Sequence, residues 1–314
     1  MFSVIIPVFN GAKFIDNAIE SVLKQTYSDW EIIIVNDGST DNTPEVLNNY
    51  EGNDKIRVIH QDNAGVSVAR NNGVGVSKGE YITFLDADDV WHNNHLEVMA
   101  KLIEKYPDAG LFGTFTRTEL VNGEVIEKSK FFDGKGEDVY TNDFFSEYYN
   151  DKAAKMFTVI TTCVSKAAFD KAGGFPVGCK IGEDLELSLV VAAYYPVVLS
   201  SVATATYKKI NSTATKTKSF DSEWHFFDKV HELYADSTIP ETKRKNLKLI
   251  MEWFSMRRCR HYVIEGERKK AFEVYKKLDK SAISKKDFVI NTILLFLPKT
   301  AVRKIFEIRW RGEA

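Results

Sequence analysis

The chain has 314 residues, of which 44% are hydrophobic and 27% are charged. These proportions are typical of a globular protein with one large domain or two ordinary ones, and they exclude a disordered chain. The net charge of −2 conceals an asymmetry, because residues 241–314 hold 20 Lys+Arg and 9 Asp+Glu, a formal +11, which leaves −13 for residues 1–240. The basic C-terminal region indicates either a face for an anionic partner, such as a membrane surface or nucleic acid, or a set of solvated helix faces.

The cysteines and the apolar runs of the sequence indicate in which cellular compartment the protein is expected. Cys163, Cys179 and Cys259 are scattered without zinc-ligand spacing, which favours a reducing compartment. The N-terminus has no basic leader, and its apolar run is short and is broken by Pro7. No apolar run reaches the length of a membrane-spanning helix. We therefore expect a cytoplasmic protein, with peripheral attachment to the inner face of the cell membrane as a further expectation.

The N-terminal part of the chain alternates short apolar strands with helices. We expect strands at 2–9, 30–35, 55–60 and from 81, and helices at 12–26, up to about residue 50 and at 69–77. This alternation predicts an open α/β sheet with parallel strands, whose ligands bind beyond the carboxyl ends of the strands. The residues that follow those ends, and so mark one ligand site, are Asn10, Asp37, Asp62, Asn63 and Asp86.

An acidic cluster follows the strand that begins at Tyr81. Asp86, Asp88 and Asp89 come within four positions, and unpaired carboxylates beside a core strand are costly to desolvate. Hard oxygen ligands suit Mg²⁺ or Mn²⁺ and, with it, a substrate diphosphate; the alternative is an acidic turn that caps the next helix. Glycine-rich dinucleotide and P-loop motifs are missing from the sequence, which argues against nicotinamide, flavin and P-loop chemistry.

Four motifs together resemble family 2 glycosyltransferases with the GT-A fold. They occur in the order and spacing of that family at residues 7–10, 37–41, 63–73 and 86–89. The resemblance implies a Rossmann-like, mixed but mostly parallel sheet flanked by helices, a UDP-sugar donor, and Mn²⁺ or Mg²⁺. It further implies that Phe9 lies against uracil, that Asp37 accepts the N3–H of uracil, and that Asp88 ligates the metal. Asp86 would approach the ribose or the metal, and the other residues expected around the nucleotide are Pro7, Asn10, Ser39, Asp41, Asn63, Arg70 and Ala87.

Three of these residues also have a plain structural interpretation: Phe9 in the core, Asp41 as a helix cap, and Arg70 at the surface. The resemblance continues at Gly173-Gly174-Phe175 and at Glu183-Asp184, where Asp184 matches the catalytic base of inverting members and Glu183 is its neighbour. A carboxylate is needed to take the proton of the acceptor hydroxyl, although two acids at a helix N-terminus also simply complement the helix dipole. Lys209 is a further candidate near the diphosphate, and residues 211–219 are a candidate lid.

The remaining segments have weaker signals. We expect a helix at 95–106, a hairpin of strands 110–119 and 121–128 turning at Val121-Asn122-Gly123, and a loop at 131–138. Later helices are expected at 243–262, ended by Gly266, and around residues 272–278, followed by an apolar run at 288–297. Trp310 among basic residues makes the last helix, 302–311, a candidate membrane-surface helix; docking on the core or on a second copy of the chain is the alternative.

The expected organisation is a nucleotide-sugar-binding half at 1–110, an acceptor and catalytic-base half at 111–219, and a basic helical extension at 220–314. The expected function is an inverting, metal-assisted glycosyltransferase that moves a sugar from a UDP-sugar to a hydroxyl of a glycan or lipid-linked saccharide, with Asp184 as general base. The competing hypotheses are a non-catalytic nucleotide-sugar- or glycan-binding protein on the same scaffold, and a nucleic-acid binder, which no recognised motif supports.

Overall fold

The computed structural model describes residues 1–119, 124–126, 129–151, 158–179, 182–208, 225–298, 300–302 and 304–305. The chain forms two compact units, one made mainly of residues 1–218 and the other mainly of residues 230–314. Within the described ranges, every helix is either too short or too polar to cross a bilayer. The expected turn at 121–123, Lys209, the candidate lid at 211–219, and most of the last expected helix (303 and 306–311) lie outside the described residues.

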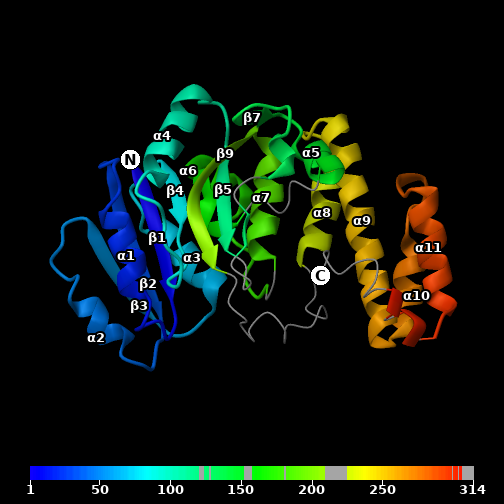
Figure 1. Cartoon of the computed structure of the whole chain (residues 1–314), viewed down its shortest axis with the longest axis horizontal. Helices are drawn as coiled ribbons and strands as arrows, with labels where there is room; N and C mark the ends of the chain where they lie inside the picture. Colours follow the sequence, from blue (N-terminus) through cyan, green and yellow to red (C-terminus); the bar gives the residue numbers. More distant parts are fainter. Residues whose placement is uncertain are drawn as a thin grey trace. The chain divides into compact units, whose positions relative to one another are not determined.

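In the described part of the chain, nine strands form one mixed sheet in the order β3-β2-β1-β4-β8-β5-β9-β7, with β6 paired to β5 (Figure 1). Strands β1, β2, β3 and β4 are mutually parallel, and β9 is parallel to β5. Strand β8 runs antiparallel to both β4 and β5, so these two also share a direction. The sheet is therefore mostly parallel, as predicted. The strands are β1 (Phe2–Val8), β2 (Trp30–Asp37), β3 (Ile56–Gln61), β4 (Tyr81–Phe84), β5 (Leu111–Glu119), β6 (Val125–Ile126), β7 (Asp138–Thr141), β8 (Thr162–Ser165) and β9 (Val197–Lys208).

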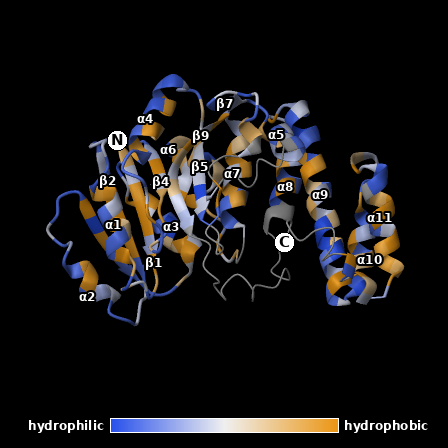
Figure 2. Ribbon diagram, in the orientation of Figure 1, coloured by the Kyte–Doolittle hydropathy of each residue, from blue (hydrophilic) through white to orange (hydrophobic). Residues whose placement is uncertain are grey.

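Helices cover both faces of the parallel strands, and for this reason every residue of β1 is buried. On one face, Val4 and Ile6 pack in a cluster with residues of α1 (Ile15–Leu23) and α4 (His95–Lys105). On the other face lies α3 (Val66–Gly75), which approaches so closely that a Cβ on Gly73 would lie 2.6 Å from Cγ2 of Ile5. Figure 2 shows the hydrophobic strands enclosed between these helices. The expected buried first strand is confirmed.

The parallel register brings the carboxyl ends of four strands to one edge of the sheet. Val8 pairs with Asn36, and Asp37 pairs with Gln61, so β1, β2 and β3 end side by side. Strand β4, which pairs with the first half of β1, ends at the same edge and leads into the acidic motif. The loops that follow these strands therefore meet, as the alternation of strands and helices predicts.

The segment between residues 129 and 172 carries structure that the sequence patterns did not indicate. The bounds of the loop expected at 131–138 are wrong at both ends. Phe131 and Phe132 are buried in a short helical turn, and Asp138 is the first residue of β7. Strand β8 inserts antiparallel between β4 and β5, where Cys163 pairs with both Thr83 and Phe112. The further helices of this unit are α2 (Thr43–Asn48), α5 (Phe144–Asp151), α6 (Lys166–Ala172) and α7 (Glu183–Tyr194).

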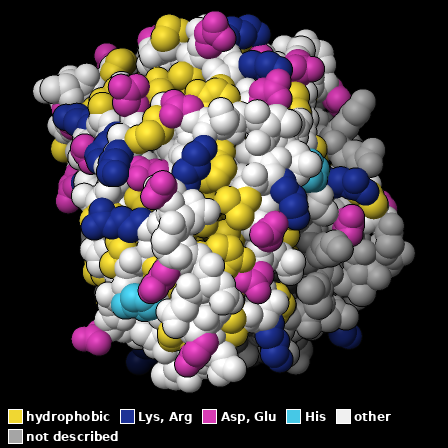
Figure 3. All heavy atoms as spheres, turned by 90° about the vertical axis from the view of Figure 1, so that its left-hand side faces the viewer, with side chains coloured by type: hydrophobic (Ala, Val, Ile, Leu, Met, Phe, Trp, Pro, Cys, Tyr) yellow, Lys and Arg dark blue, Asp and Glu magenta, His cyan; other side chains and the backbone are white. Residues whose placement is uncertain are grey.

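The expected acidity of residues 1–240 does not produce a uniformly acidic surface on the face that Figure 3 shows. Basic and acidic side chains are interspersed there, with hydrophobic side chains between them. On this face the negative charge is therefore not gathered in one large patch.

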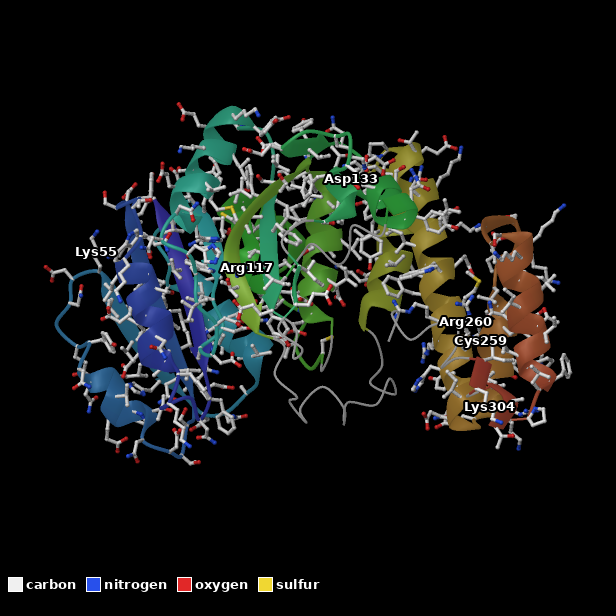
Figure 4. All side chains as sticks on the ribbon, viewed as in Figure 1. Lys55, Arg117, Asp133, Cys259, Arg260 and Lys304 are labelled. Carbon is white, nitrogen blue, oxygen red and sulfur yellow. The ribbon has the colours of Figure 1, made fainter. Side chains whose placement is uncertain are left out.

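The second unit consists of helices. Gly266, with a φ of 86°, ends α9 in the left-handed conformation that glycine adopts readily, which confirms the predicted break. The hydrophobic core of the second unit is formed by side chains of α9, α10 and α11, among them Cys259, Ala271 and Leu294. Figure 4 labels Cys259 on α9. The helices are α9 (Glu241–Glu265), α10 (Arg268–Lys277), α11 (Lys285–Phe296) and the end of α8 (His225–Ala235), whose residues up to Lys229 belong to the first unit.

Candidate functional site

A cavity of about 400 Å³ opens at the carboxyl edge of the parallel strands. This volume lies within the range of small-molecule binding sites. Four separate segments of the chain line the cavity, and each contains residues singled out from the sequence. The lining residues are Pro7, Phe9, Asn10, Gly11, Phe14, Val66, Arg70, Asp86, Ala87, Asp88 and Glu183.

One part of the cavity wall is apolar and faces solvent. The side chains of Phe9 and Phe14 are 53% and 51% exposed, and Val66 is 38% exposed. Phe9 is therefore not a core residue. The helix expected at 12–26 begins later, at Ile15, so Phe14 precedes α1 and lies at the cavity. These side chains offer an exposed apolar surface against which a ring can pack.

Asn10 joins the loop after β1 to the loop after β2. Its Oδ1 accepts hydrogen bonds from the backbone N–H groups of Thr40 (2.8 Å) and Asp41 (3.3 Å), and its own N–H donates to Oγ of Ser39 (2.9 Å). Asn10 has a φ of 52°, a left-handed conformation that asparagine tolerates better than most residues. Asn10, Ser39 and Asp41 thus hold the two loops together beside the cavity.

Asp41 is part of the same cross-link. Its carboxylate accepts hydrogen bonds from the hydroxyl and the N–H of Thr43 and from the N–H of Ala12. The donation by the Thr43 hydroxyl is the main reason why the pKa of Asp41 lies below its ordinary value. The residue at the N-cap of α2 is Asn42, whose side chain makes no capping hydrogen bond, and Asp41 instead accepts the N–H of Thr43, the first residue of the helix. The helix-cap interpretation of Asp41 therefore holds in part.

Asp37 is 4% exposed and organises the loop after β3. Its carboxylate accepts hydrogen bonds from Nε2 of Gln61 (2.7 Å) and from the N–H groups of Ala64 (2.8 Å) and Gly65 (2.9 Å). Asn63 donates from its side-chain amide to the carbonyl oxygen of Asp37 (3.0 Å). A carboxylate has about four lone-pair positions, so these contacts leave one acceptor position of Asp37 unused. Asp37 is not among the residues that line the cavity.

Arg70 lies at the centre of the site. It is 3% exposed, and its guanidinium donates from Nη2 to Oδ1 of Asp86 (2.8 Å) and from Nη1 to Oε1 of Glu183 (3.1 Å). Burial lowers the pKa of Arg70, but the two carboxylates raise it by more. The surface interpretation of Arg70 is therefore wrong. Among the described residues, Nε of Arg70 has no hydrogen-bond partner, although it is buried.

Asn71, the next residue on α3, was missed as a site residue. Its side-chain amide donates to the carbonyl oxygen of Phe175 (2.9 Å) and its Oδ1 accepts from the N–H of Phe175 (2.8 Å). Gly174 has a φ of 78°, and a Cβ there would lie 2.8 Å from Oδ1 of Asn71. The Phe175 ring packs against Phe84 at 4.9 Å and lies 5.1 Å from the Arg70 guanidinium. The glycine pair and the aromatic residue therefore fix the segment that leads to α7.

Glu183 and Asp184 begin α7, as predicted. Glu183 lines the cavity, whereas Asp184, its half-buried neighbour, is not among the lining residues. Burial, and then the negative charge of Glu183, raise the pKa of Asp184 to about 6, while the N–H of Leu185 and the charge of Arg70 oppose the rise. A carboxyl group with such a pKa is ionised at neutral pH and still basic enough to take a proton.

The acidic motif carries negative charge beyond what Arg70 neutralises. Asp88 is exposed at the cavity, and burial together with the charges of Asp86 and Asp88 raises the pKa of Asp89 to about 7. The described part of the chain has no group of three or more His, Cys, Asp or Glu side chains placed to hold a metal ion. Mg²⁺ and similar ions are often held by one or two carboxylates plus substrate phosphates. The oxygen donors of Asp86 and Asp88 fit an ion that is bound jointly with a diphosphate.

The segment after the acidic motif is anchored to the end of β9. The ring of His92 contacts Oγ1 of Thr206 (2.8 Å) and the carbonyl oxygen of Ala203 (3.2 Å). The ring of His95, which is fully buried, contacts Oγ1 of Thr204 (2.7 Å), and burial lowers its pKa to about 3. His95 therefore remains neutral. Sequence reasoning missed both histidines, because no metal-ligand or catalytic spacing marks them.

Comparison with known proteins finds consistent relatives. Residues 3–171 match the family described as Glycosyl transferase family 2. The chain is 41% identical over 125 residues to the glycosyltransferase GlyG of Streptococcus pneumoniae serotype 4, which is 39% of this chain and 42% of GlyG. The match thus spans less than half of the length of that relative.

Two solved structures share the fold at low identity. One is TarS 1–349 from S. aureus in complex with UDP-GlcNAc, with a TM-score of 0.65, 19% identity, and coverage of 92% of this chain and 79% of that one. The other is the mannosyltransferase PcManGT from Pyrobaculum calidifontis in complex with GDP-Man and Mn²⁺, with a TM-score of 0.57, 16% identity, and coverage of 98% and 87%.

Proposed function

Because the chain belongs to glycosyl transferase family 2, we propose that it transfers a sugar from a UDP-sugar to a hydroxyl of a glycan or lipid-linked saccharide, with inversion at the anomeric carbon. One observation carries the proposal. Asp86 and Asp88 after β4 and Glu183 at the start of α7 line the same cavity, and Arg70 joins Asp86 to Glu183. Carboxylates from distant parts of the chain thus converge on one pocket.

The donor end of the proposed site is the edge of the parallel strands. Phe9 supplies a stacking face for uracil, and Asp37 supplies an acceptor for its N3–H. The bound UDP-GlcNAc of TarS and the bound GDP-Man of PcManGT support a nucleotide-sugar donor. In this proposal residues 1–110 bind the donor, and residues 111–219 supply the catalytic base and the acceptor contacts.

The chemical step requires a base opposite the leaving diphosphate. Asp184 takes the proton of the acceptor hydroxyl while the hydroxyl oxygen attacks the anomeric carbon. The pKa of about 6 suits this role near neutral pH. Glu183, held by Arg70, keeps the start of α7 against the cavity.

Asp88 and Asp86 are the residues that would hold Mn²⁺ or Mg²⁺. The ion supplies positive charge for the diphosphate that leaves. The chain's own contribution is to orient Asp86, whose Oδ1 is bonded to Arg70, leaving its other oxygen for a ligand. Lys209, the further candidate near the diphosphate, lies outside the described residues.

A non-catalytic nucleotide-sugar-binding protein is the competing function, and a donor panel separates the two. The full chain is incubated with UDP- and GDP-linked sugars, with Mn²⁺ or with EDTA, and the released nucleotide is measured alongside nucleotide affinity by calorimetry. The transferase proposal requires Mn²⁺-dependent release from at least one donor, and release that increases with a hydroxyl acceptor. Tight nucleotide binding without release from any donor, with or without acceptors, contradicts catalysis.

A further inference from the structure

Helix α11 is apolar on two opposite sides. Leu294 and Leu295 are buried in the core of the second unit. Val289, Ile293 and Phe296 are 53%, 52% and 75% exposed. An amphipathic surface helix is expected to carry a single apolar stripe. The exposed side of α11 therefore needs a partner.

Polar contacts fix which side of α11 faces the unit. Asn291 is 1% exposed, and its Oδ1 accepts a hydrogen bond from Nε of Arg260 on α9 (3.0 Å). Oγ1 of Thr292 lies 2.6 Å from the hydroxyl oxygen of Tyr275 on α10. Figure 4 labels Arg260 on α9, within the second unit. At about 100° per residue, buried Asn291 lies on the side of α11 opposite Val289 and Ile293, and Thr292 lies at the edge of the exposed side. The exposed apolar side chains therefore have no route into the core.

The exposed side carries positive charge as well as apolar groups. At about 100° per residue, Lys285, Lys286, Val289, Ile293 and Phe296 fall within an arc of about 100°. Lys285 and Lys286 are both exposed. Residues 268–305 hold 11 Lys+Arg and 3 Asp+Glu. An apolar stripe with lysines beside it is the pattern of a helix that lies in the surface of an anionic bilayer.

We propose that this α11 face, formed by Lys285, Lys286, Val289, Ile293 and Phe296, docks on an anionic lipid surface. A helix of 12 residues is about 18 Å long, which is shorter than the hydrocarbon core of a bilayer, so α11 lies along the surface. A second copy of the chain fits less well, because a two-fold interface would bring the same lysines together. A nucleic acid is a poorer partner, because it is bound mainly through its phosphates and would leave the apolar stripe without a contact.

The test measures binding of the full chain to vesicles by sedimentation, using pure phosphatidylcholine and phosphatidylcholine mixed with phosphatidylglycerol. Binding is expected only with the anionic vesicles. The variant Lys285→Glu/Lys286→Glu should lower the partition coefficient roughly tenfold or more, and Ile293→Ser/Phe296→Ser should abolish binding. The control Ile126→Ser, which changes an exposed apolar residue of the first unit, should bind as the wild type does.

These substitutions lie at exposed positions, so the melting temperatures of the variants should match that of the wild type. A loss of binding cannot then be attributed to unfolding. Equal binding to neutral vesicles, or unchanged binding of both α11 variants, overturns the proposal. A dimer in sedimentation velocity that Ile293→Ser/Phe296→Ser converts to monomer also overturns it, because the face is then an interface between copies. The readout is independent of transferase activity, so failure here leaves the proposed reaction untouched.

Discussion

Arg70 and Glu183 lie 113 positions apart in the chain, yet Nη1 of Arg70 is 3.1 Å from Oε1 of Glu183. The same guanidinium is bonded to Asp86. One buried cation therefore connects the acidic motif at the end of β4 with the N-terminus of α7. In the structure, Arg70 orients two carboxylates through Nη1 and Nη2, while its Nε is buried without a hydrogen-bond partner among the described residues.

We expect Arg70→Ala to lower the free energy of unfolding by roughly 1.5–3 kcal/mol, because it leaves two partly buried carboxylates without their charged partner. Arg70→Lys keeps the charge but not the two-pronged geometry, so it should retain more stability while losing most turnover. Urea unfolding and UDP release measure the two effects. The control is Arg57→Lys at an exposed position of β3, which should change neither. If Arg70→Ala unfolds like the wild type, Arg70 is not the link between the two segments.

Asn71→Ala should cost about 1–3 kcal/mol of unfolding free energy, because the N–H and the carbonyl oxygen of Phe175 lose their partner. Turnover should fall further than donor affinity, since the loosened segment leads to Asp184 rather than to the nucleotide. Thermal melting, kcat and the donor KM are the measurements. The neighbouring Asn72 is exposed, so Asn72→Ala serves as the matched control. A rise in KM at unchanged kcat would assign Asn71 to donor binding instead.

The sequence predicted the parallel half of the fold because each signal there is local. Buried strands, helical spacing and polar strand ends all occur between residues 2 and 89, and parallel pairing brings those ends to one edge. The insertion of β8 between β4 and β5 had no such signal. Its four residues acquire their place from contacts with distant strands, which no local pattern encodes.

Part of the cavity lining was predictable from the sequence, but not how the residues there are connected. Phe9, Asp88 and Glu183 stand in recognisable motifs and line the cavity. The partners of Arg70 and Asn71 could not be read from the sequence, because their contacts cross 113 and 104 positions. Phe14 falls within the helix expected at 12–26 but precedes α1, because an apolar residue at helical spacing does not reveal where the helix begins.

Phe9→Ala should weaken UDP binding without reducing stability. The ring is 53% exposed, so its removal leaves no cavity in the core. Stacking of a base on an aromatic ring contributes roughly 1–3 kcal/mol, which corresponds to about 5- to 150-fold in Kd. Calorimetry with UDP gives the affinity, and thermal melting gives the stability. A lower melting temperature with unchanged affinity would instead give Phe9 a structural role.

Divalent cations should stabilise the protein through the acidic motif. Mn²⁺ with UDP is expected to raise the melting temperature, because the ion neutralises Asp86 and Asp88 and binds only the folded site. Asp88→Ala should remove the Mn²⁺-dependent part of the increase and weaken UDP binding in Mn²⁺ towards the level seen in EDTA. Asp62→Ala, at an exposed aspartate near the same edge of the sheet, is the control. An undiminished Mn²⁺ effect in Asp88→Ala would remove Asp88 as a ligand.

Asp184→Asn should abolish turnover and at the same time stabilise the protein above pH 6. Folding raises the pKa of Asp184 from 3.8 to about 6, chiefly through burial. The folded state therefore holds the proton more tightly, and the free energy of unfolding falls as the pH rises from about 4 to about 6. The full cost, at most about 3 kcal/mol, is present above pH 6, and asparagine avoids it.

The pH profile of the wild type tests whether the ionisation of Asp184 that lowers stability also controls catalysis. If Asp184 is the base, kcat/KM should rise as the pH increases through about 6, the range in which the carboxyl group ionises. Melting curves between pH 4 and pH 8 should show the stability of Asp184→Asn overtaking that of the wild type over the same range. UDP affinity should be nearly equal in the two proteins. Substantial transfer by Asp184→Asn would assign the base to another group, with Glu183 as the next candidate at the cavity.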